Sequence, residues 1–299
     1  MSLSQNEIFN ILRISAAIVL LAAAARSDWK TRTAENWIWM ILGALGIILL
    51  GAHMILEKWE TQSYLGLILV ILAFVDIFWE RPPLYDKKKK KPGYAGITLL
   101  AFGMFCLVML LISDIDWEQK AIPLSVVGMI YLTYMLYLTN VVHGGADAKA
   151  LMVLAMLFPL YPGVFSLPLL ETPELMGIFF PFALLILFNA ALATLVIPIA
   201  LLFHNARKHD LELPKALLGY KKNIERDPEF CWPMEKAEGE KTSFSYFPKK
   251  GMDVEKEFEA LRQLGRKEVW VTPKIPFLIP MLIGLLVSIV VGNILWLFF

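Results

Sequence analysis

The feature that most constrains this chain is a series of apolar blocks, each long enough to form a helix that crosses a membrane. The hydrocarbon core of a bilayer is about 30 Å thick, so a spanning helix needs roughly 17 to 25 residues. Such blocks lie near 8–27, 37–56, 63–80, 94–113, 121–141, 147–163, 175–203 and 274–298. With 58% hydrophobic and 18% charged residues, the chain is too apolar for an ordinary water-soluble domain. We therefore predict an all-α polytopic membrane protein with about eight transmembrane helices.

One long polar segment, 204–272, separates the last two blocks. Within it Val254, Phe258, Leu261 and Leu264 recur at helical spacing, which predicts a helix near 252–264. The sequence thus predicts a membrane catalytic core at 1–203, a small polar domain at 204–272 and a C-terminal helix at 273–299. No catalytic motif appears in the polar domain, so we expect it to support the structure or to position a substrate.

The lysine run Lys87–Lys91 predicts the orientation of the chain in the membrane. Loops rich in Lys and Arg remain in the cytoplasm, which puts the loop 81–93 on that side. Alternation of the spans then places 28–36, 142–147 and 204–272 in the cytoplasm and both termini outside. We predict a multi-pass protein of the cell membrane.

Three acidic residues lie within or at the ends of apolar blocks. Asp28 ends the first block, Asp147 opens the sixth and Asp76 lies in the third. A carboxylate at the bilayer centre costs roughly 2.5 to 3.5 kcal/mol, so such acids have a functional or an interfacial reason to be there. Taken singly, Asp28 fits a solvated helix end and Asp147 fits a helix N-terminus. The predicted topology nevertheless puts both on one membrane face at similar depth, whereas Asp76, followed by Trp79, fits an interfacial role.

Two carboxylates at hydrogen-bonding distance cannot both ionise freely and share a proton. In aspartic proteases one of them takes a proton from the attacking water while its partner donates a hydrogen bond to the peptide carbonyl. This chemistry needs no metal or cofactor, and we predict none. Gly144 and Gly145 precede Asp147, and residues without side chains let a substrate backbone come close. A simple turn between two spans explains the glycines equally well.

Together these residues resemble a known family. Gly144–Asp147 resembles the GxGD element of membrane aspartyl proteases, which include prepilin peptidases, archaeal preflagellin peptidases and presenilin-type enzymes. Asp28, followed by Arg32 and Asn36, resembles the first-aspartate element of the prepilin and preflagellin peptidase branch. The segment Trp270–Phe277 is similar to the C-terminal part of larger archaeal members. The resemblance covers the first six blocks in order and spacing.

The resemblance implies a membrane aspartyl endopeptidase with Asp28 and Asp147 as catalytic residues. Its expected substrates are flagellin or type IV pilin-like precursors that carry a short basic leader followed by a hydrophobic helix. The expected site of cleavage is the cytoplasmic membrane face. The sequence departs from the family in two ways: Ala146 replaces the second glycine of the motif, and eight blocks exceed the six spans usual for small preflagellin peptidases.

Two other classes of protein compete with this hypothesis. A transporter would also carry charged residues and glycine breaks in its spans, but it would place them at mid-depth and not at one face. A non-enzymatic scaffold would use 204–272 to bind a cytoplasmic partner, and neither Asp28 nor Asp147 would then matter. The formal net charge of +1, without a concentrated basic face, gives no reason to expect a nucleic-acid partner.

Overall fold

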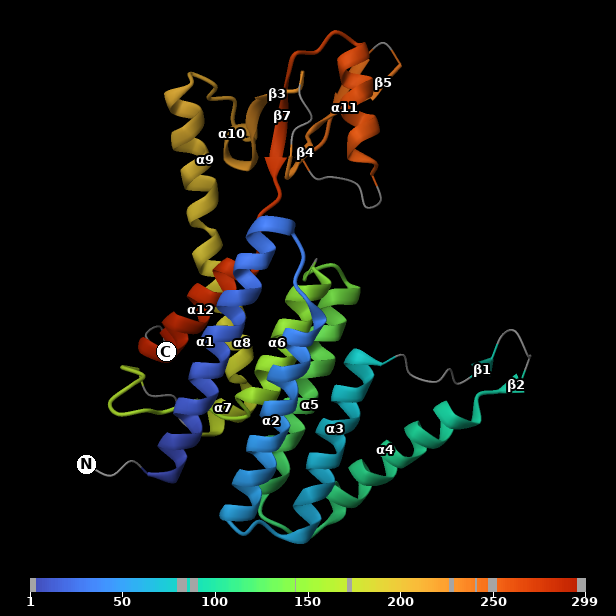
Figure 1. The fold of residues 1–299 in the computed structure, drawn as a ribbon, viewed down its shortest axis with the longest axis vertical. Coiled ribbons are helices and arrows are strands. Elements are labelled where there is room, and N and C mark those ends of the chain that lie inside the picture. The colour runs from blue at the N-terminus through green and yellow to red at the C-terminus, as the bar shows by residue number, and fades with distance from the viewer. Residues whose placement is uncertain are drawn as a thin grey trace. The chain divides into compact units, whose positions relative to one another are not determined.

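The computed structural model describes residues 4–79, 85–86, 91–142, 144–170, 174–225, 229–239, 241–246 and 252–294. The chain forms two compact units. Unit 1 contains Met1–Ala191 and Pro276–Phe299, and unit 2 contains Leu192–Ile275 (Figure 1). The three-part division predicted from sequence, at 203/204 and 272/273, stays a prediction.

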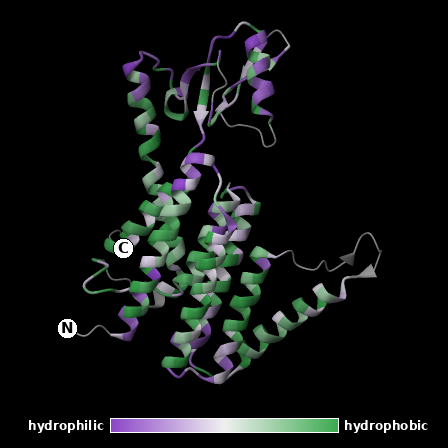
Figure 2. Ribbon diagram, viewed as in Figure 1, coloured by the Kyte–Doolittle hydropathy of each residue, from purple (hydrophilic) through white to green (hydrophobic). Residues whose placement is uncertain are grey.

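Six stretches of helix in the described residues are long and apolar enough to cross a membrane. The described parts of unit 1 are largely hydrophobic, as Figure 2 shows. This finding supports a multi-pass membrane protein, but the predicted count of about eight spans is not confirmed. The stretches are α1 (Gln5–Thr31), α2 (Asn36–Leu56), the 3-10 turn η1 (Thr61–Ser63) with α3 (Tyr64–Phe78), α4 (Tyr94–Ile112), α5 (Trp117–Leu138), and Phe182–Arg207, which contains α8 (Phe182–Thr194) and α9 (Val196–Arg207).

Two of the predicted spans correspond to short helices. The blocks 147–163 and 274–298 form α6 (Gly145–Leu157) and α12 (Leu278–Val290), each of 13 residues. At 1.5 Å per residue each helix is only about 20 Å long, which is less than the hydrocarbon core requires.

The reason for the apolar sequence of α6 is its position inside unit 1. Nine of its residues, from Ala148 to Leu157, are buried, because α2 and α5 both pack against it. A helix that is covered on all sides is apolar on all sides, whether or not it spans a membrane. The contact with α2 is close: a Cβ on Gly46 would lie 2.7 Å from the backbone nitrogen of Leu157. Glycine at that position lets the two backbones touch.

The rest of unit 1 surrounds this core. Helix α1 packs against α2 and α12, and α3 packs against α4 and α5. A buried hydrogen bond of 2.8 Å from the Asn189 amide to the Ser288 hydroxyl joins α8 to α12. The short helix α7 (Glu174–Phe179) precedes α8, and a two-residue ladder joins β1 (Tyr85–Asp86) to β2 (Lys91–Pro92).

Unit 2 contains β-structure, so the all-α prediction is wrong for this part of the chain. An antiparallel sheet has the strand order β3-β7-β4, with Tyr220 opposite Val271 and Trp232 opposite Thr272. Strands β5 and β6 form a separate antiparallel hairpin, with Gly239 in its turn at a φ of +63°. The strands are β3 (Tyr220–Asn223), β4 (Cys231–Pro233), β5 (Glu235–Glu238), β6 (Lys241–Phe244) and β7 (Glu268–Pro273). The longest, β7, is rich in the β-branched and aromatic residues that favour strands.

The helices of unit 2 are shorter and more polar. The predicted helix near 252–264 is confirmed as α11 (Val254–Gln263), which buries Phe258 and Leu261 against Val269 and Val271 of the sheet. Helix α10 (Lys215–Leu218) is tied to α9 by the buried amide of Asn205, which donates to the carbonyl oxygens of residues 216 and 219 at 2.9 and 2.7 Å.

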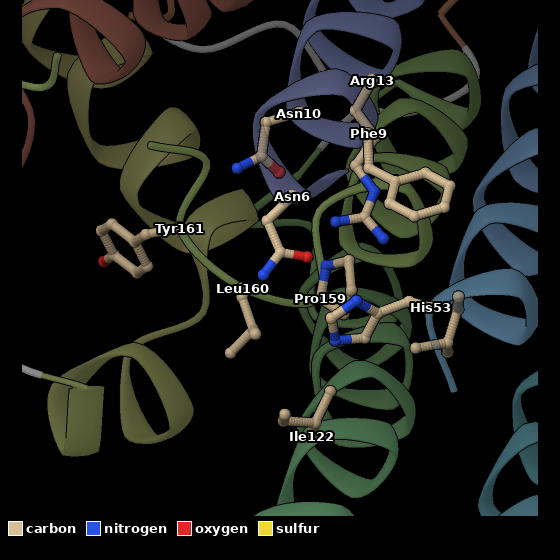
Figure 3. A pocket seen from close by; sticks show the side chains of 10 residues that line it. Asn6, Phe9, Asn10, Arg13, His53, Ile122, Pro159, Leu160 and Tyr161 are labelled. Carbon is tan, nitrogen blue, oxygen red and sulfur yellow. The ribbon is translucent and has the colours of Figure 1, made fainter. Parts of the chain in front are cut away.

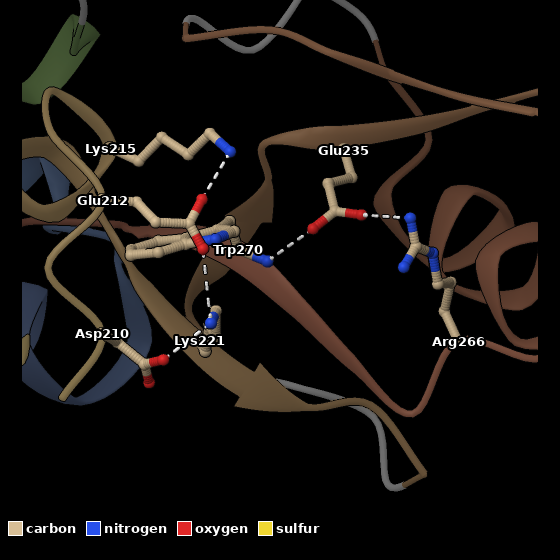
Figure 4. Close-up of polar contacts among 7 residues, drawn as sticks. All are labelled: Asp210, Glu212, Lys215, Lys221, Glu235, Arg266 and Trp270. Atoms are coloured by element: carbon tan, nitrogen blue, oxygen red, sulfur yellow. Dashed lines mark hydrogen bonds and ion pairs between the residues drawn. The ribbon is translucent and has the colours of Figure 1, made fainter. Parts of the chain in front are cut away.

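Ion pairs cover one side of the unit 2 sheet (Figure 4). The Lys221 ammonium lies 2.6 Å from Asp210 and 3.5 Å from Glu212, and Glu212 also lies 2.8 Å from Lys215. The hydrogen bond to Asp210 raises the pKa of Lys221, and the hydrogen bond from Lys215 lowers the pKa of Glu212. On the other side of Trp270, Glu235 accepts from the Trp270 backbone N–H at 3.1 Å. Each acid in this group has a basic or N–H partner.

Candidate active site

Asp28 lies in the last turn of α1, where the helix is closed by Arg32. Arg32 adopts a left-handed conformation with φ of 56°, and its backbone N–H donates to the Asp28 carbonyl at 3.0 Å. The Arg32 guanidinium donates to the same carbonyl at 3.3 Å. The Asp28 side chain is half-buried. A carboxylate at a helix C-terminus meets the negative end of the helix dipole, so Asp28 needs favourable groups from elsewhere.

Helix α12 supplies one such group. The backbone N–H of Leu278, the first residue of α12, interacts with the Asp28 carboxyl, and the positive charge of Arg32 acts on it as well. The N-terminus of α12 is thus a favourable neighbour for a carboxylate at the end of α1. This contact gives α12 a place in the candidate site, although it is too short to count among the spans.

Asp147 lies in the first turn of α6, three residues after the N-cap residue Gly144. Its carboxyl folds back over Gly144: a Cβ on Gly144 would lie 2.8 Å from Asp147 Cγ and closer still to Oδ2. A side chain at 144 would therefore occupy the space that the carboxyl uses. Glycine at position 144 therefore leaves room for the Asp147 carboxyl.

The fold brings Asp28 and Asp147 near one another at one end of unit 1. Helices α1 and α6 are in contact, and the charge of Asp28 acts on the Asp147 carboxyl. Two like charges in partly buried positions repel, and the repulsion is relieved when one carboxyl holds a proton. This arrangement suits acid–base chemistry in which one carboxyl is protonated and the other ionised.

Lys149, which follows the Gly144–Asp147 element, contacts Asn36 of the first-aspartate element. Its ammonium donates to the Asn36 side-chain oxygen at 2.8 Å and lies 5.8 Å from the centre of the Phe78 ring. Asn36 begins α2 and Phe78 ends α3, so the starts of α2 and α6 and the end of α3 meet at the same end of unit 1. Sequence reasoning named Asn36 as part of a motif but gave Lys149 no role. Its position two residues after Asp147 was the available signal.

The remaining predicted residues have clear positions. Gly145 is exposed, and a Cβ there would meet only the Tyr137 hydroxyl at 3.8 Å. Ala146 is partly buried and packs against the core, so the alanine that replaces the second motif glycine is accommodated. Asp76 is half-buried in α3 and interacts with another group, and its interfacial role stays a prediction. His143, which precedes the motif, lies outside the described residues.

Metal ligands do not gather in the described part of the chain. No group of three or more His, Cys, Asp or Glu side chains among these residues is placed to hold a metal ion. Asp28 and Asp147, the two predicted catalytic acids, come from different helices of this end of unit 1.

Helices that can span a membrane, with two interacting acids at one end, define a class of membrane protein with a carboxylate site. Comparison with known proteins indicates which family of this class the chain resembles. Residues 212–294 match the family model described as "Archaeal Peptidase A24 C-terminus Type II". A preflagellin peptidase of Methanocaldococcus jannaschii is 26% identical over 220 residues, covering 70% of this chain and 88% of the relative. A preflagellin peptidase of Methanococcus voltae is 28% identical over 219 residues, covering 69% and 88%. No solved structure matches.

These matches support the archaeal preflagellin and prepilin peptidase family, so the resemblance predicted from the motifs is confirmed. The matched model covers most of unit 2 together with α12. The segment 270–277, assigned from sequence to larger archaeal members of this family, lies inside that match.

Proposed function

We propose that the chain is a membrane aspartyl endopeptidase that removes short basic leaders from flagellin or type IV pilin-like precursors. The observation that carries the proposal is the meeting of Asp28 and Asp147, from separate helices, close enough for their charges to interact. The preflagellin peptidases among its relatives support a precursor of the same kind as the substrate.

The chemistry follows from the sharing of one proton between the two acids. The ionised carboxyl takes a proton from a water molecule as the oxygen of that water attacks the scissile carbonyl carbon. The protonated carboxyl donates a hydrogen bond to the carbonyl oxygen, on which negative charge develops. When the tetrahedral intermediate collapses, a proton passes to the leaving amine.

The cytoplasmic side of the membrane is the expected location of this site. The run Lys87–Lys91 follows α3, whose last residue, Phe78, lies beside Lys149. The lysine-rich loop therefore starts at the same end of unit 1 as Asp147. Since such loops stay in the cytoplasm, the acids are expected there too. A precursor whose hydrophobic helix is inserted in the membrane presents its basic leader at that face.

Replacement of each acid by its amide tests the proposal. Asp28→Asn and Asp147→Asn keep the size of the side chain but remove the proton that the reaction must move. Each should lower cleavage of a leader-bearing precursor by about a hundredfold to ten-thousandfold, the usual contribution of a general acid or base. The double variant should be little worse than either single one, because groups that act as a unit are strongly non-additive. Cleavage is measured with the full chain in lipid vesicles.

Asp116→Asn is the matched control, since Asp116 is an exposed N-cap residue of α5 and asparagine caps a helix equally well. It should cut at the parent rate. Thermal stability in detergent is measured beside cleavage, and relief of repulsion should leave the two site variants at least as stable as the parent. A folded Asp28→Asn or Asp147→Asn protein that cleaves normally would refute the assignment of that residue.

A further inference from the structure

A second polar feature lies at the opposite end of unit 1. A cavity of about 200 Å³ is lined by residues of α1, α2 and α5 and by the segment that follows α6. Figure 3 shows Arg13, Asn6, His53 and Tyr161 around it. Arg13 precedes Asp28 by 15 positions along α1, which corresponds to about 22 Å. The cavity is therefore separate from the candidate active site.

Arg13 is the unusual residue of this cavity. Its side chain reaches into the space in Figure 3, and its exposed fraction is only 6%. The Nε and Nη2 atoms are buried and have no hydrogen-bond partner among the described residues. The nearby His53 ring packs edge-on against Trp59, with 5.8 Å between the ring centres.

A buried guanidinium with unpaired donors is destabilising, because guanidinium groups remain charged in proteins and a buried charge needs a partner. Native proteins pair nearly all buried donors, so orphaned donors that face a cavity indicate a missing acceptor. The five donors of arginine form a planar fork that fits the oxygens of a phosphate or carboxylate.

We propose that this cavity binds a phosphoryl oxyanion, with Arg13 as its main ligand. The cavity volume of about 200 Å³ equals the volume that about seven water molecules occupy in the liquid, which is room for a phosphate group with some of its water. Arg13 is the ninth residue of α1 and so lies about 12 Å from the start of that helix. A long basic side chain at this depth can reach the headgroup layer of a bilayer, where lipid phosphates are the abundant anions.

Other polar atoms complete the binding surface. Asn6 is exposed, lies two turns of α1 before Arg13 and points toward the cavity in Figure 3. The Asn10 amide is already used, because it donates to the Gly163 carbonyl at 2.9 Å, which leaves its oxygen as an acceptor for water. The Tyr161 hydroxyl donates to the Phe180 carbonyl at 2.8 Å and fixes the segment that closes the cavity. Among the described residues that line the cavity, Arg13 and Asn6 are thus groups that can meet an anion.

The test uses the purified full chain in an uncharged detergent and measures thermal unfolding with four additions. These are phosphatidylglycerol, an uncharged galactolipid, inorganic phosphate and chloride, with ionic strength held constant. Binding to the folded protein raises the unfolding temperature in proportion to the logarithm of ligand concentration. A rise with phosphatidylglycerol alone identifies a lipid headgroup, and a rise with inorganic phosphate identifies a free anion. Either result supports the proposal.

Variants connect the effect to Arg13. Arg13→Gln should weaken the apparent affinity by about tenfold or more, the value of a charge-assisted hydrogen bond. Arg13→Lys keeps the charge without the fork and should retain part of the rise. Arg26→Gln, an exposed arginine at the other end of α1, removes an equal charge and should behave like the parent. An equal rise with galactolipid, no rise with either phosphate source, or a full rise in Arg13→Gln would each overturn the proposal.

Discussion

The two units of the chain treat their charged groups in opposite ways. In unit 2, Asp210, Glu212, Lys215 and Lys221 join in ion pairs at a partly exposed surface. In unit 1, like charges meet at one end, and a buried guanidinium faces a cavity at the other. Paired surface charges add little free energy in either direction, whereas like or unpaired charges in apolar surroundings are costly.

The difference indicates where function is to be sought. A fold keeps costly charges when they do chemistry or bind a ligand, although ion-pair networks can also perturb charged groups. Substitutions in unit 1 should therefore change activity or ligand binding more than stability. Substitutions in the unit 2 network should change local stability slightly and leave the chemistry alone.

The sharpest test of this contrast compares two neighbouring glycines. Gly144→Ala should lower cleavage by about a hundredfold, because the new Cβ displaces the Asp147 carboxyl and a shift of about 1 Å in a catalytic group can cost that much. Gly145→Ala meets nothing but a hydroxyl at 3.8 Å and should stay within about twofold of the parent. The rate of precursor cleavage and the unfolding temperature of both variants are measured together.

The alternative explanation of these glycines gives a different result. If the pair serves mainly to let a substrate backbone lie along the turn, both alanine variants should lose activity, and mainly through a higher KM. Equal losses in Gly144→Ala and Gly145→Ala would therefore remove the structural explanation and favour the substrate-contact hypothesis.

The link between Lys149 and Asn36 should have the next largest effect. Lys149→Met removes the 2.8 Å hydrogen bond that ties the start of α6 to the start of α2. We expect kcat to fall by about tenfold with little change in KM, since the bond positions Asp147 and does not contact substrate. Asn36→Ala should have the same effect, and the double variant should be no worse than either. Lys208→Met, an exposed lysine after α9, is the control.

Additive losses in Lys149→Met and Asn36→Ala would show that the two residues act separately. Lys149 would then have a role of its own, for instance in contact with the precursor. Unit 1 would in that case contain residues that bind substrate as well as residues that position the acids.

Some of this organisation could be predicted from the sequence. Apolar blocks predict membrane helices because bilayer thickness fixes their length, and the helix over 252–264 could be predicted because Phe258 and Leu261 recur at helical spacing. The span count could not, because composition does not reveal whether an apolar helix such as α6 is covered by lipid or by other helices. The sheet of unit 2 was missed because its strands are only three to six residues long.

The candidate site also has features that the sequence predicts and features that only the structure reveals. Asp28 and Asp147 could be singled out because acids are rare at the ends of apolar blocks. The fold of Asp147 over Gly144 and the approach of the Leu278 N–H to Asp28 depend on three-dimensional packing between distant segments. Arg13 did carry a signal, since it is a charged residue in the interior of an apolar block. Only the structure shows that two of its guanidinium nitrogens are buried and have no hydrogen-bond partner among the described residues.

The smallest expected effect concerns Glu212 in unit 2. The hydrogen bond from Lys215 holds the pKa of Glu212 below its ordinary value of 4.5. A group with a lowered pKa stabilises the fold above its unfolded pKa and loses this contribution as the pH falls through the folded value. At pH 7, Glu212→Gln should therefore speed hydrogen exchange in β3 by roughly twofold relative to the parent, as expected for an exposed ion pair. The difference should shrink as the pH is lowered below about 4.5. Because parent and variant are compared at the same pH, the intrinsic exchange rate cancels.

Glu259→Gln, at an exposed acid of α11, is the control and should leave the exchange rate in β3 unchanged. Cleavage of the precursor at pH 7 should be the same in all three proteins, and a loss of activity in Glu212→Gln alone would give the unit 2 network a part in catalysis and end the contrast between the two units.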